Sequence, residues 1–235
     1  FDGGNLRNAI AREAVAVAAV PASYKETLRV QLNLFIADVE AEFAVTEKQI
    51  KIDLESAEKP TAVIDDSTAK RLLYALYACP HGVLRMSDDM PGLVETSTNL
   101  ASVKMGENNR ILIATSQRSS VESAKYDVAR MVESVFVLAG AAATHGDGYP
   151  GWKPNPNSKL AKLTAETYEK LFGEKAKIRA IHAGLECGLF LEKYPHLDMV
   201  SVGPTMRGVH SPDERLHIAH TEKFWKLLVA LLASL

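Results

Sequence analysis

Apolar residues recur at helical spacing along much of the chain. Between residues 23 and 43, apolar side chains follow at steps of three and four, namely Leu28, Leu32, Phe35, Val39 and Phe43. Ser23 stands three residues before Glu26, which is the spacing of a capping box at a helix N-terminus. The pattern therefore predicts an amphipathic helix over 23–43.

Four further segments have the same periodicity. They predict helices over 67–78, 120–140, 159–172 and 221–233. Ser119 and Ser120 can cap the helix at 120–140, and Gly140 suits a helix C-terminus. Pro80 ends the helix that precedes it.

Alternating or β-branched segments predict the strands. They lie at 9–20, 49–54, 177–182 and 199–202, with an antiparallel hairpin formed by 100–105 and 110–115 around a Gly-Glu-Asn-Asn turn. Helices mixed with antiparallel strands predict an α+β domain in the first part of the chain. The last part has an α/β pattern but too few strands for a sheet of its own, so we expect it to complete a sheet whose other strands lie elsewhere.

Residues 145–158 (HGDGYPGWKPNPNS) are the most linker-like segment. They predict a domain boundary that separates residues 1–147 from residues 148–235. The segment also contains the string Gly146-x-Gly148-x-x-Gly151, which matches a dinucleotide-binding fingerprint. That fingerprint requires a helix directly afterwards, and the prolines at 150, 154 and 156 prevent one, so we interpret the segment as a linker.

Composition excludes several classes of function. The 235 residues carry 27 Lys and Arg against 29 Asp and Glu, a formal net charge of -2, so there is no basic surface for nucleic acid or an anionic membrane. The apolar runs are shorter than the roughly 20 residues that span a bilayer, so we expect no membrane association. Cys79 and Cys187 show no disulfide or zinc-binding spacing, which favours a cytoplasmic location.

Candidate chemistry is concentrated in two loops near the C-terminus. His210 lies in the loop 203–214, directly after a predicted strand, where open α/β sheets bind ligands. Its imidazole could bind zinc with Asp213 or Glu214 as a hydrogen-bonding partner, or the segment could be an ordinary polar loop. The other loop is 182–188. There Glu186 faces either solvent or a positively charged ligand, whereas His182 and Cys187 are more typical of structural residues.

Two residues in the first half of the chain could bind a substrate. Arg118 ends a predicted hairpin strand, and its guanidinium could bind a carboxylate through two parallel hydrogen bonds. Asn8 could donate an amide hydrogen bond, although turn chemistry explains an asparagine there equally well. From the residues alone, neither role is distinguished from an ordinary surface position.

Five sequence blocks, taken together and in order, resemble the bacterial aminoacyl-histidine dipeptidases. These cytosolic metallopeptidases cleave Xaa-His dipeptides, as carnosinases do. The blocks are GGNLRNAIAREA at 3–14, VETSTN at 94–99, YPGWKP at 149–154, HAGLECGLF at 182–190 and HSPDE at 210–214. They run through the whole chain, and the last two are specific enough to disfavour a deacetylase or an aminoacylase on the same architecture.

The resemblance implies a lid domain and a catalytic domain. Residues 1–147 would form most of an α+β lid and dimerisation domain, and 148–235 would form the C-terminal part of an α/β catalytic domain with two zinc ions, for which cobalt or manganese could substitute. By motif match, His210 would bind zinc, Arg118 would bind the C-terminal carboxylate of the dipeptide, Asn8 would lie near the scissile carbonyl, and Glu186 would line the substrate pocket. The partners implied are a dipeptide and a second copy of the chain.

The family's other metal ligands and its general-base glutamate find no match in this sequence. The resemblance assigns them to a stretch before Phe1, so this chain would hold none of the catalytic groups. We therefore expect a C-terminal portion of a dipeptidase that is inactive alone, because a two-metal site needs ligands beyond His210. The alternative is a non-catalytic lid and dimerisation module.

Overall fold

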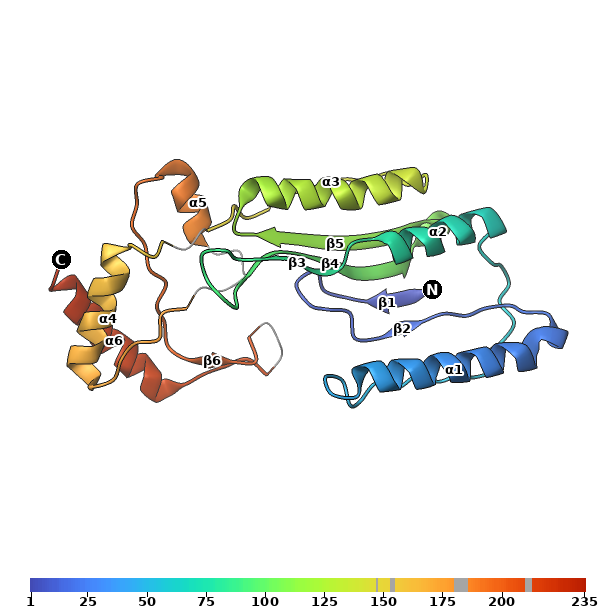
Figure 1. Ribbon diagram of the computed structural model, residues 1–235, viewed down its shortest axis with the longest axis horizontal. Coiled ribbons are helices and arrows are strands. Elements are labelled where there is room, and N and C mark those ends of the chain that lie inside the picture. Colours follow the sequence, from blue (N-terminus) through green and yellow to red (C-terminus); the bar gives the residue numbers. More distant parts are fainter. Residues whose placement is uncertain (147, 153–154, 180–185, 210–212) are drawn as a thin grey trace. The chain divides into compact units, whose positions relative to one another are not determined.

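A computed structural model describes residues 1–146, 148–152, 155–179, 186–209 and 213–235 (Figure 1). The chain forms two compact units. Unit 1 comprises Phe1–Ala78 and Leu100–Thr115, and unit 2 comprises Cys79–Asn99 and Ser116–Leu235. The boundary expected at residue 147 stays a prediction.

Helices and antiparallel strands make up both units. The helices are α1 (Lys25–Phe43), α2 (Asp66–Ala78), α3 (Glu122–Leu138), α4 (Lys159–Phe172), α5 (Glu186–Lys193) and α6 (Ile218–Leu232). The strands are β1 (Asp2–Gly4), β2 (Ala14–Val15), β3 (Gly82–Met86), β4 (Val94–Met105), β5 (Ile111–Ser119), β6 (Met206–Arg207) and β7 (Arg215–Leu216). The architecture of the described residues is therefore α+β, as the sequence predicts.

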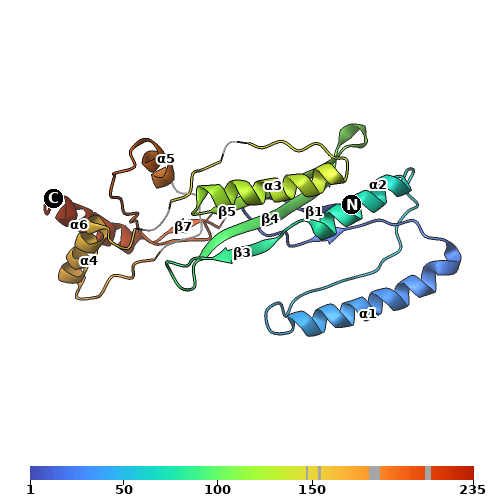
Figure 2. The same cartoon turned by 45° about the horizontal axis from the view of Figure 1, so that its top comes forward.

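The longest strand, β4, organises the larger sheet. The strand order is β2-β1-β4-β3, and β5 also pairs with β4. In unit 1, β1 is antiparallel to the C-terminal part of β4, with Gly3 opposite Val103. In unit 2, β3 is antiparallel to the N-terminal part of β4, with Gly82 opposite Thr98 (Figure 2). A second, two-stranded sheet pairs β6 with β7.

The predicted hairpin is confirmed, and its strands are longer than expected. The N–H of Gly106 donates to the carbonyl oxygen of Arg110 at 2.8 Å, which closes the turn between β4 and β5. Asn108 and Asn109 adopt φ of 57° and 58° in that turn. Asparagine tolerates this left-handed region better than most residues, so the sequence of the turn matches its backbone.

Several predicted strands are wrong in whole or in part. The residues that lack strand pairing are 9–13, 16–20, 49–54, 177–179 and 199–202, while 180–182 lie outside the described residues. Of the first segment, only Ala14–Val15 pairs, as β2. Alternation marks a segment that fits a sheet, but strands become ordered only where another strand satisfies their N–H and C=O groups.

The helices agree better with the sequence, because their hydrogen bonds are local. The helix α4 has the predicted bounds, with the Oγ of Ser158 accepting from the N–H of Ala161 at 2.9 Å and Gly173 at φ 70°. The helix α3 ends at Leu138, and Gly140, the residue expected at its C-terminus, follows two residues later at φ 80°. The helix α6 begins at Ile218, three residues earlier than predicted.

The capping box predicted for the first long helix is wrong. A short 3-10 turn over Ala22–Tyr24 comes first, and Tyr24 occupies the N-cap position of α1 without a side-chain hydrogen bond. The helix itself is confirmed. Within α1 no residue is fully buried, and one stripe is half-buried, formed by Leu28, Leu32, Ile36 and Val39.

Each unit has a small core. Among the described residues, the buried apolar side chains are Ala75, Ala101 and Val103 in unit 1, and Cys79, Val128, Val132, Phe136, Leu227 and Leu231 in unit 2. In unit 2, α4 and α6 pack side by side (Figure 1). Among the same residues, none of the helices combines the length and the apolar character that a membrane span requires.

Aspartates stabilise the first turns of two helices. Hydrogen bonds from Thr68 and Ser67 hold the pKa of Asp65, before α2, well below its usual range. Near the start of α4, hydrogen bonds from the N–H of Leu160 and from Ser158 lower the pKa of Asp198. Because the pKa of each carboxyl is lower in the folded state, the charged form stabilises the fold at any pH above the ordinary pKa of about 3.9. This contribution is lost as the pH falls through the folded-state pKa.

We therefore expect acid to weaken the fold partly through these two carboxylates. In urea unfolding followed by circular dichroism, acidification from neutral pH to about pH 2 lowers the midpoint of the unsubstituted chain. The Asp65→Asn and Asp198→Asn double variant has a lower midpoint at neutral pH and a smaller further loss in acid. An equal loss on acidification in both chains would show that other groups dominate the acid response.

Candidate substrate-binding site

Arg118, the residue predicted to bind a carboxylate, lies on β5 and is half-buried. Within the part of the chain that the structure describes, no hydrogen bond or ion pair engages its guanidinium. A partly buried guanidinium has lost some of its hydration and gains from an anionic partner. The side chain is therefore available to a carboxylate ligand.

The residues on either side of Arg118 form a buried polar network on the opposite face of the strand. The Nε2 of Gln117 donates to the Oγ1 of Thr98 at 3.1 Å. The hydroxyl oxygens of Ser119 and Thr96 lie 2.8 Å apart, and Thr96 and Thr98 are only 2% and 3% exposed. Because side chains alternate along a strand, this network on one face of β5 fixes the backbone that carries Arg118 on the other.

The hydroxyls of this network have a defined donor order. The N–H of Val121 donates to the Oγ of Ser119 at 3.0 Å, and the Oγ1 of Thr96 donates to the Oε1 of Glu95 at 3.3 Å. Because the hydroxyl of Thr96 has a single proton, Ser119 must donate to Thr96. The buried Glu95 also has the Nε of Arg85 at 3.7 Å from its Oε1. The N-cap position of α3 is Val121, which makes no side-chain cap hydrogen bond, so the prediction that Ser119 and Ser120 cap this helix is wrong.

Asn8 lies in a turn after β1 and is exposed. It belongs to unit 1, whereas Arg118 belongs to unit 2. Gly4, in the same sequence block, has φ 62°, and a Cβ there would overlap the carbonyl oxygen of Ala101. Only glycine fits at that position, so the block has a structural requirement for β1 to lie beside β4.

The remaining predicted site residues are described in part or not at all. The backbone of Glu186 begins α5, but its side chain lies outside the described residues, as do His182 and His210. Cys187 is a half-buried free thiol, and Cys79 is buried, which raises the pKa of its thiol. A thiol with a raised pKa is a poor nucleophile at neutral pH, so Cys79 fits a packing role.

The zinc site stays a prediction. Among residues 1–146, 148–152, 155–179, 186–209 and 213–235, there is no group of three or more His, Cys, Asp or Glu side chains that could hold a metal ion. His210, the proposed ligand, is not one of them. The described residues therefore hold no complete metal centre of their own.

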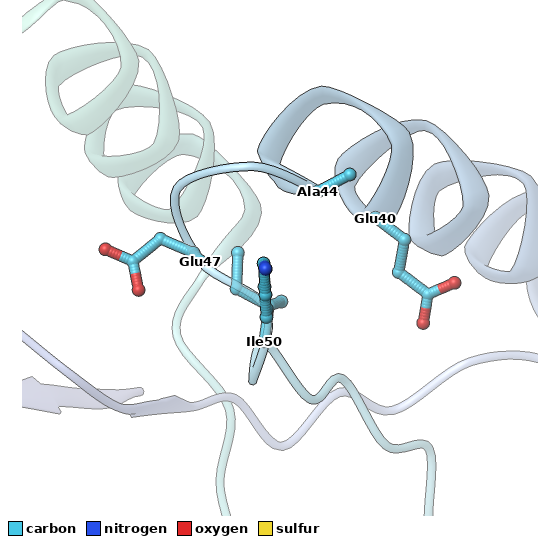
Figure 3. A pocket seen from close by; sticks show the side chains of 5 residues that line it. Glu40, Ala44, Glu47 and Ile50 are labelled. Atoms are coloured by element: carbon cyan, nitrogen blue, oxygen red, sulfur yellow. The ribbon is translucent and has the colours of Figure 1, made fainter.

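Neither Arg118 nor Asn8 lines the two open cavities described next. In unit 1, a cavity of about 270 Å³ at the end of α1 is lined by Glu40, Ala44, Glu47, Lys48 and Ile50. The carboxylates of Glu40 and Glu47 point away from each other there, so they do not form a paired acid (Figure 3). In unit 2, a cavity of about 380 Å³ lies between α4, α6 and the segment 201–205.

Sequence reasoning missed the structure of the predicted linker. The N–H of Gly151 donates to the Oε2 of Glu122 at 3.1 Å, and the Nζ of Lys125 donates to the carbonyl oxygen of Tyr149 at 3.1 Å. Both partners lie in the first turns of α3. The available signal was weak: an acid and a lysine three residues apart at a helix start also suit an ordinary surface ion pair.

Comparisons with known proteins agree over nearly the whole chain. Peptidase family M20/M25/M40 matches residues 19–234. The chain is 43% identical to the cytosol non-specific dipeptidase of Escherichia coli (strain K12) over 235 residues, which is 100% of this chain and 48% of that protein. The crystal structure of aminoacylhistidine dipeptidase from Vibrio alginolyticus superposes with a TM-score of 0.87 at 41% identity and covers 100% of this chain and 48% of that one.

These findings confirm the resemblance to the aminoacyl-histidine dipeptidases and the predicted fold class. They also show that the chain spans about half the length of the relatives it matches.

Proposed function

Because the chain belongs to peptidase family M20/M25/M40, we propose that it supplies the lid and the C-terminal catalytic segment of a metal-dependent dipeptidase. The observation that supports this most directly is Arg118, a half-buried guanidinium that has no partner among the described residues and lies on a strand fixed by the Thr96, Thr98, Gln117 and Ser119 network. Such a cation is suited to a free carboxylate, which every dipeptide carries.

Arg118 would select substrates by length. A planar guanidinium binds a carboxylate through two parallel hydrogen bonds, which fixes the orientation as well as the position of the substrate. A longer or amidated peptide presents no carboxylate at that point and leaves the cation unpaired in a partly dehydrated site. We infer that Xaa-His dipeptides such as β-alanyl-histidine are substrates of this kind.

The other proposed contacts complete the binding of the dipeptide. Asn8 would donate its amide N–H near the scissile carbonyl, and Glu186 would line the pocket where the substrate ammonium lies. The amide would stabilise the oxygen of that carbonyl as charge develops on it. Both roles rest on the match of their sequence blocks to the family.

Membership of the family implies a divalent metal, and we propose zinc, with cobalt or manganese as substitutes. His210 would be the zinc ligand that this chain contributes. A bound metal of this kind supplies activation of the attacking water. We further propose a cytoplasmic location and a homodimer formed through the lid.

A chimera tests the proposal. We expect a polypeptide in which these 235 residues replace the aligned part of the Escherichia coli relative to hydrolyse β-alanyl-histidine, to lose activity with a chelator and to regain it with zinc. The unaltered relative is the control. The 235-residue chain alone, tested beside it, should give no hydrolysis. An inactive chimera that folds like the control would contradict the dipeptidase assignment.

One observation favours the second candidate, a non-catalytic lid and dimerisation module. The helix α1 exposes large apolar side chains on its surface, among them Val30, Leu34 and Phe35, each more than half exposed. Such a face suits contact with another protein chain. If the chain is such a module, the 235-residue chain should self-associate without bound zinc. The chimera should then not hydrolyse dipeptides, and this result distinguishes the module from the dipeptidase.

A further inference from the structure

The segment 149–151 is held against α3 by two charged side chains. Glu122 accepts the N–H of Gly151 at 3.1 Å, and Lys125 donates to the carbonyl oxygen of Tyr149 at 3.1 Å. The Nζ of Lys125 also lies 2.6 Å from the Oε1 of Glu122. One ion pair thus binds a backbone donor and a backbone acceptor two residues apart, which prevents the segment from sliding along α3.

Two glycines let this segment approach its neighbours closely. A Cβ on Gly151 would lie 2.7 Å from the carbonyl oxygen of Ser119 and 2.8 Å from that of Ser120. A Cβ on Gly188, in α5, would overlap the carbonyl oxygen of Pro150. Backbone therefore packs directly on backbone on both sides of the segment, and neither contact can yield through a side-chain rotation.

The ion pair is partly shielded from water. The side chain of Lys125 is only 14% exposed, and that of Glu122 is 44% exposed. Burial raises the pKa of Glu122. The charge of Lys125 and hydrogen bonds from Lys125, the N–H of Gly151 and Tyr126 together lower it by more, so the pKa of Glu122 is below its ordinary value. Glu122 is therefore ionised at neutral pH, and Lys125 would lose its carboxylate partner if Glu122 were replaced.

We propose that Glu122, Lys125 and the segment 149–151 form a clamp that sets the position of α5 relative to the end of β5. Arg118 directly precedes Ser119, whose carbonyl oxygen contacts Gly151, and Glu186 begins α5 two residues before Gly188. The clamp thereby joins the two elements that carry these substrate-binding residues. Glu122 and Lys125 are positioning residues, and their role in recognition rests on the function proposed above.

The first test uses fluorescence of the 235-residue chain and does not depend on activity. Trp152 follows the clamp directly, and Trp225→Phe removes the other tryptophan. Gly151→Ala should shift the Trp152 emission to longer wavelength and increase its quenching by acrylamide, because the new methyl group displaces the segment from β5. Gly148→Ala is the matched control, since a Cβ there has open space around it.

The same measurement tests the ion pair. Glu122→Ala should increase quenching of Trp152, because the N–H of Gly151 and the ammonium of Lys125 both lose their acceptor. Glu222→Gln is the matched control, because Glu222 forms an ion pair with Lys226 at 2.7 Å within α6, and among the described residues its carboxylate accepts from no backbone N–H. Equal quenching in Gly151→Ala and Gly148→Ala, or in Glu122→Ala and Glu222→Gln, would overturn the clamp.

The second test uses kinetics of the active chimera. Lys125→Met should displace Glu186 relative to Arg118. We therefore expect KM for dipeptides to rise about tenfold, with a much smaller change in kcat. Lys125→Arg should restore KM, because it keeps a charged donor. A purely structural defect would instead lower kcat in proportion to the folded fraction and leave KM unchanged, and that result would overturn the positioning role. If the unsubstituted chimera is inactive, the proposed function fails, while fluorescence still decides whether the clamp exists.

Discussion

Arg118→Ala in the active chimera is expected to lower kcat/KM for dipeptides about 100-fold, mainly through a higher KM. Removing one partner of a desolvated charge pair costs about 2–5 kcal/mol, and about 3 kcal/mol corresponds to that factor. The effect appears in KM because the carboxylate of the substrate is bound equally in the ground state and in the transition state. Steady-state kinetics on β-alanyl-histidine measures both constants.

Two comparisons separate recognition from a general loss of structure. Dipeptide amides, which lack the carboxylate, should react with the unsubstituted and the Arg118→Ala chimera at similar, low rates. Arg110→Ala is the matched control, because Arg110 is exposed in the hairpin turn beside the same strand. Unchanged kinetics in Arg118→Ala would remove Arg118 from the substrate-binding site.

His210→Ala is expected to abolish most hydrolysis and to lower the bound metal. Metal ions in hydrolytic sites contribute several kcal/mol to catalysis, so loss of a ligand should reduce kcat by about a thousandfold. Metal analysis of the purified chimera should show less zinc per chain than in the unsubstituted chimera. Dialysis against a weak chelator should widen that difference, because the remaining ligands hold the metal less tightly.

His196→Ala is the matched control for this variant. His196 is an exposed histidine elsewhere in unit 2, so its removal should change neither the zinc content nor kcat. A His210→Ala chimera with full zinc content and full activity would show that the imidazole at position 210 is not a ligand.

Helices could be predicted from this sequence because their determinants are local. The bounds of α4 follow from Ser158 and Gly173, which cap its two ends within a few residues of the hydrophobic stripe. The hairpin is similarly local, since its turn closes through Gly106 and Arg110. Gly140, which follows the end of α3 at Leu138 with φ 80°, is a short-range signal of the same kind.

Strand pairing could not be predicted in the same way. Residues 9–20 and 199–202 have strand-like composition, yet outside Ala14–Val15 they find no partner strand among the described residues. Strand formation depends on residues distant in sequence, and alternation does not report whether such a partner is present. The capping box at Ser23 failed for a related reason, because an added 3-10 turn moved the N-cap to Tyr24.

The site was predictable only in its chemistry. The sequence indicates that Arg118 could bind a carboxylate, but whether another side chain of the described residues already engages its guanidinium depends on the fold. The tightly packed position of Gly151 was hidden inside a segment rich in glycine and proline, where local signals indicate only a flexible connection. The space available to a Cβ at Gly151 depends on residues distant in sequence, so no local pattern predicts it.

The small size of the two cores has a thermodynamic consequence. Nine apolar side chains are buried among the described residues, whereas large ones such as Trp225 and Leu232 on α6 are each 62% exposed. Any molecule that covers these surfaces in the folded state, and does not bind the unfolded chain, shifts the folding equilibrium by mass action. The stability of this polypeptide is then a property of its surroundings as well as of its sequence, and its melting temperature varies with the concentration of whatever occupies those faces.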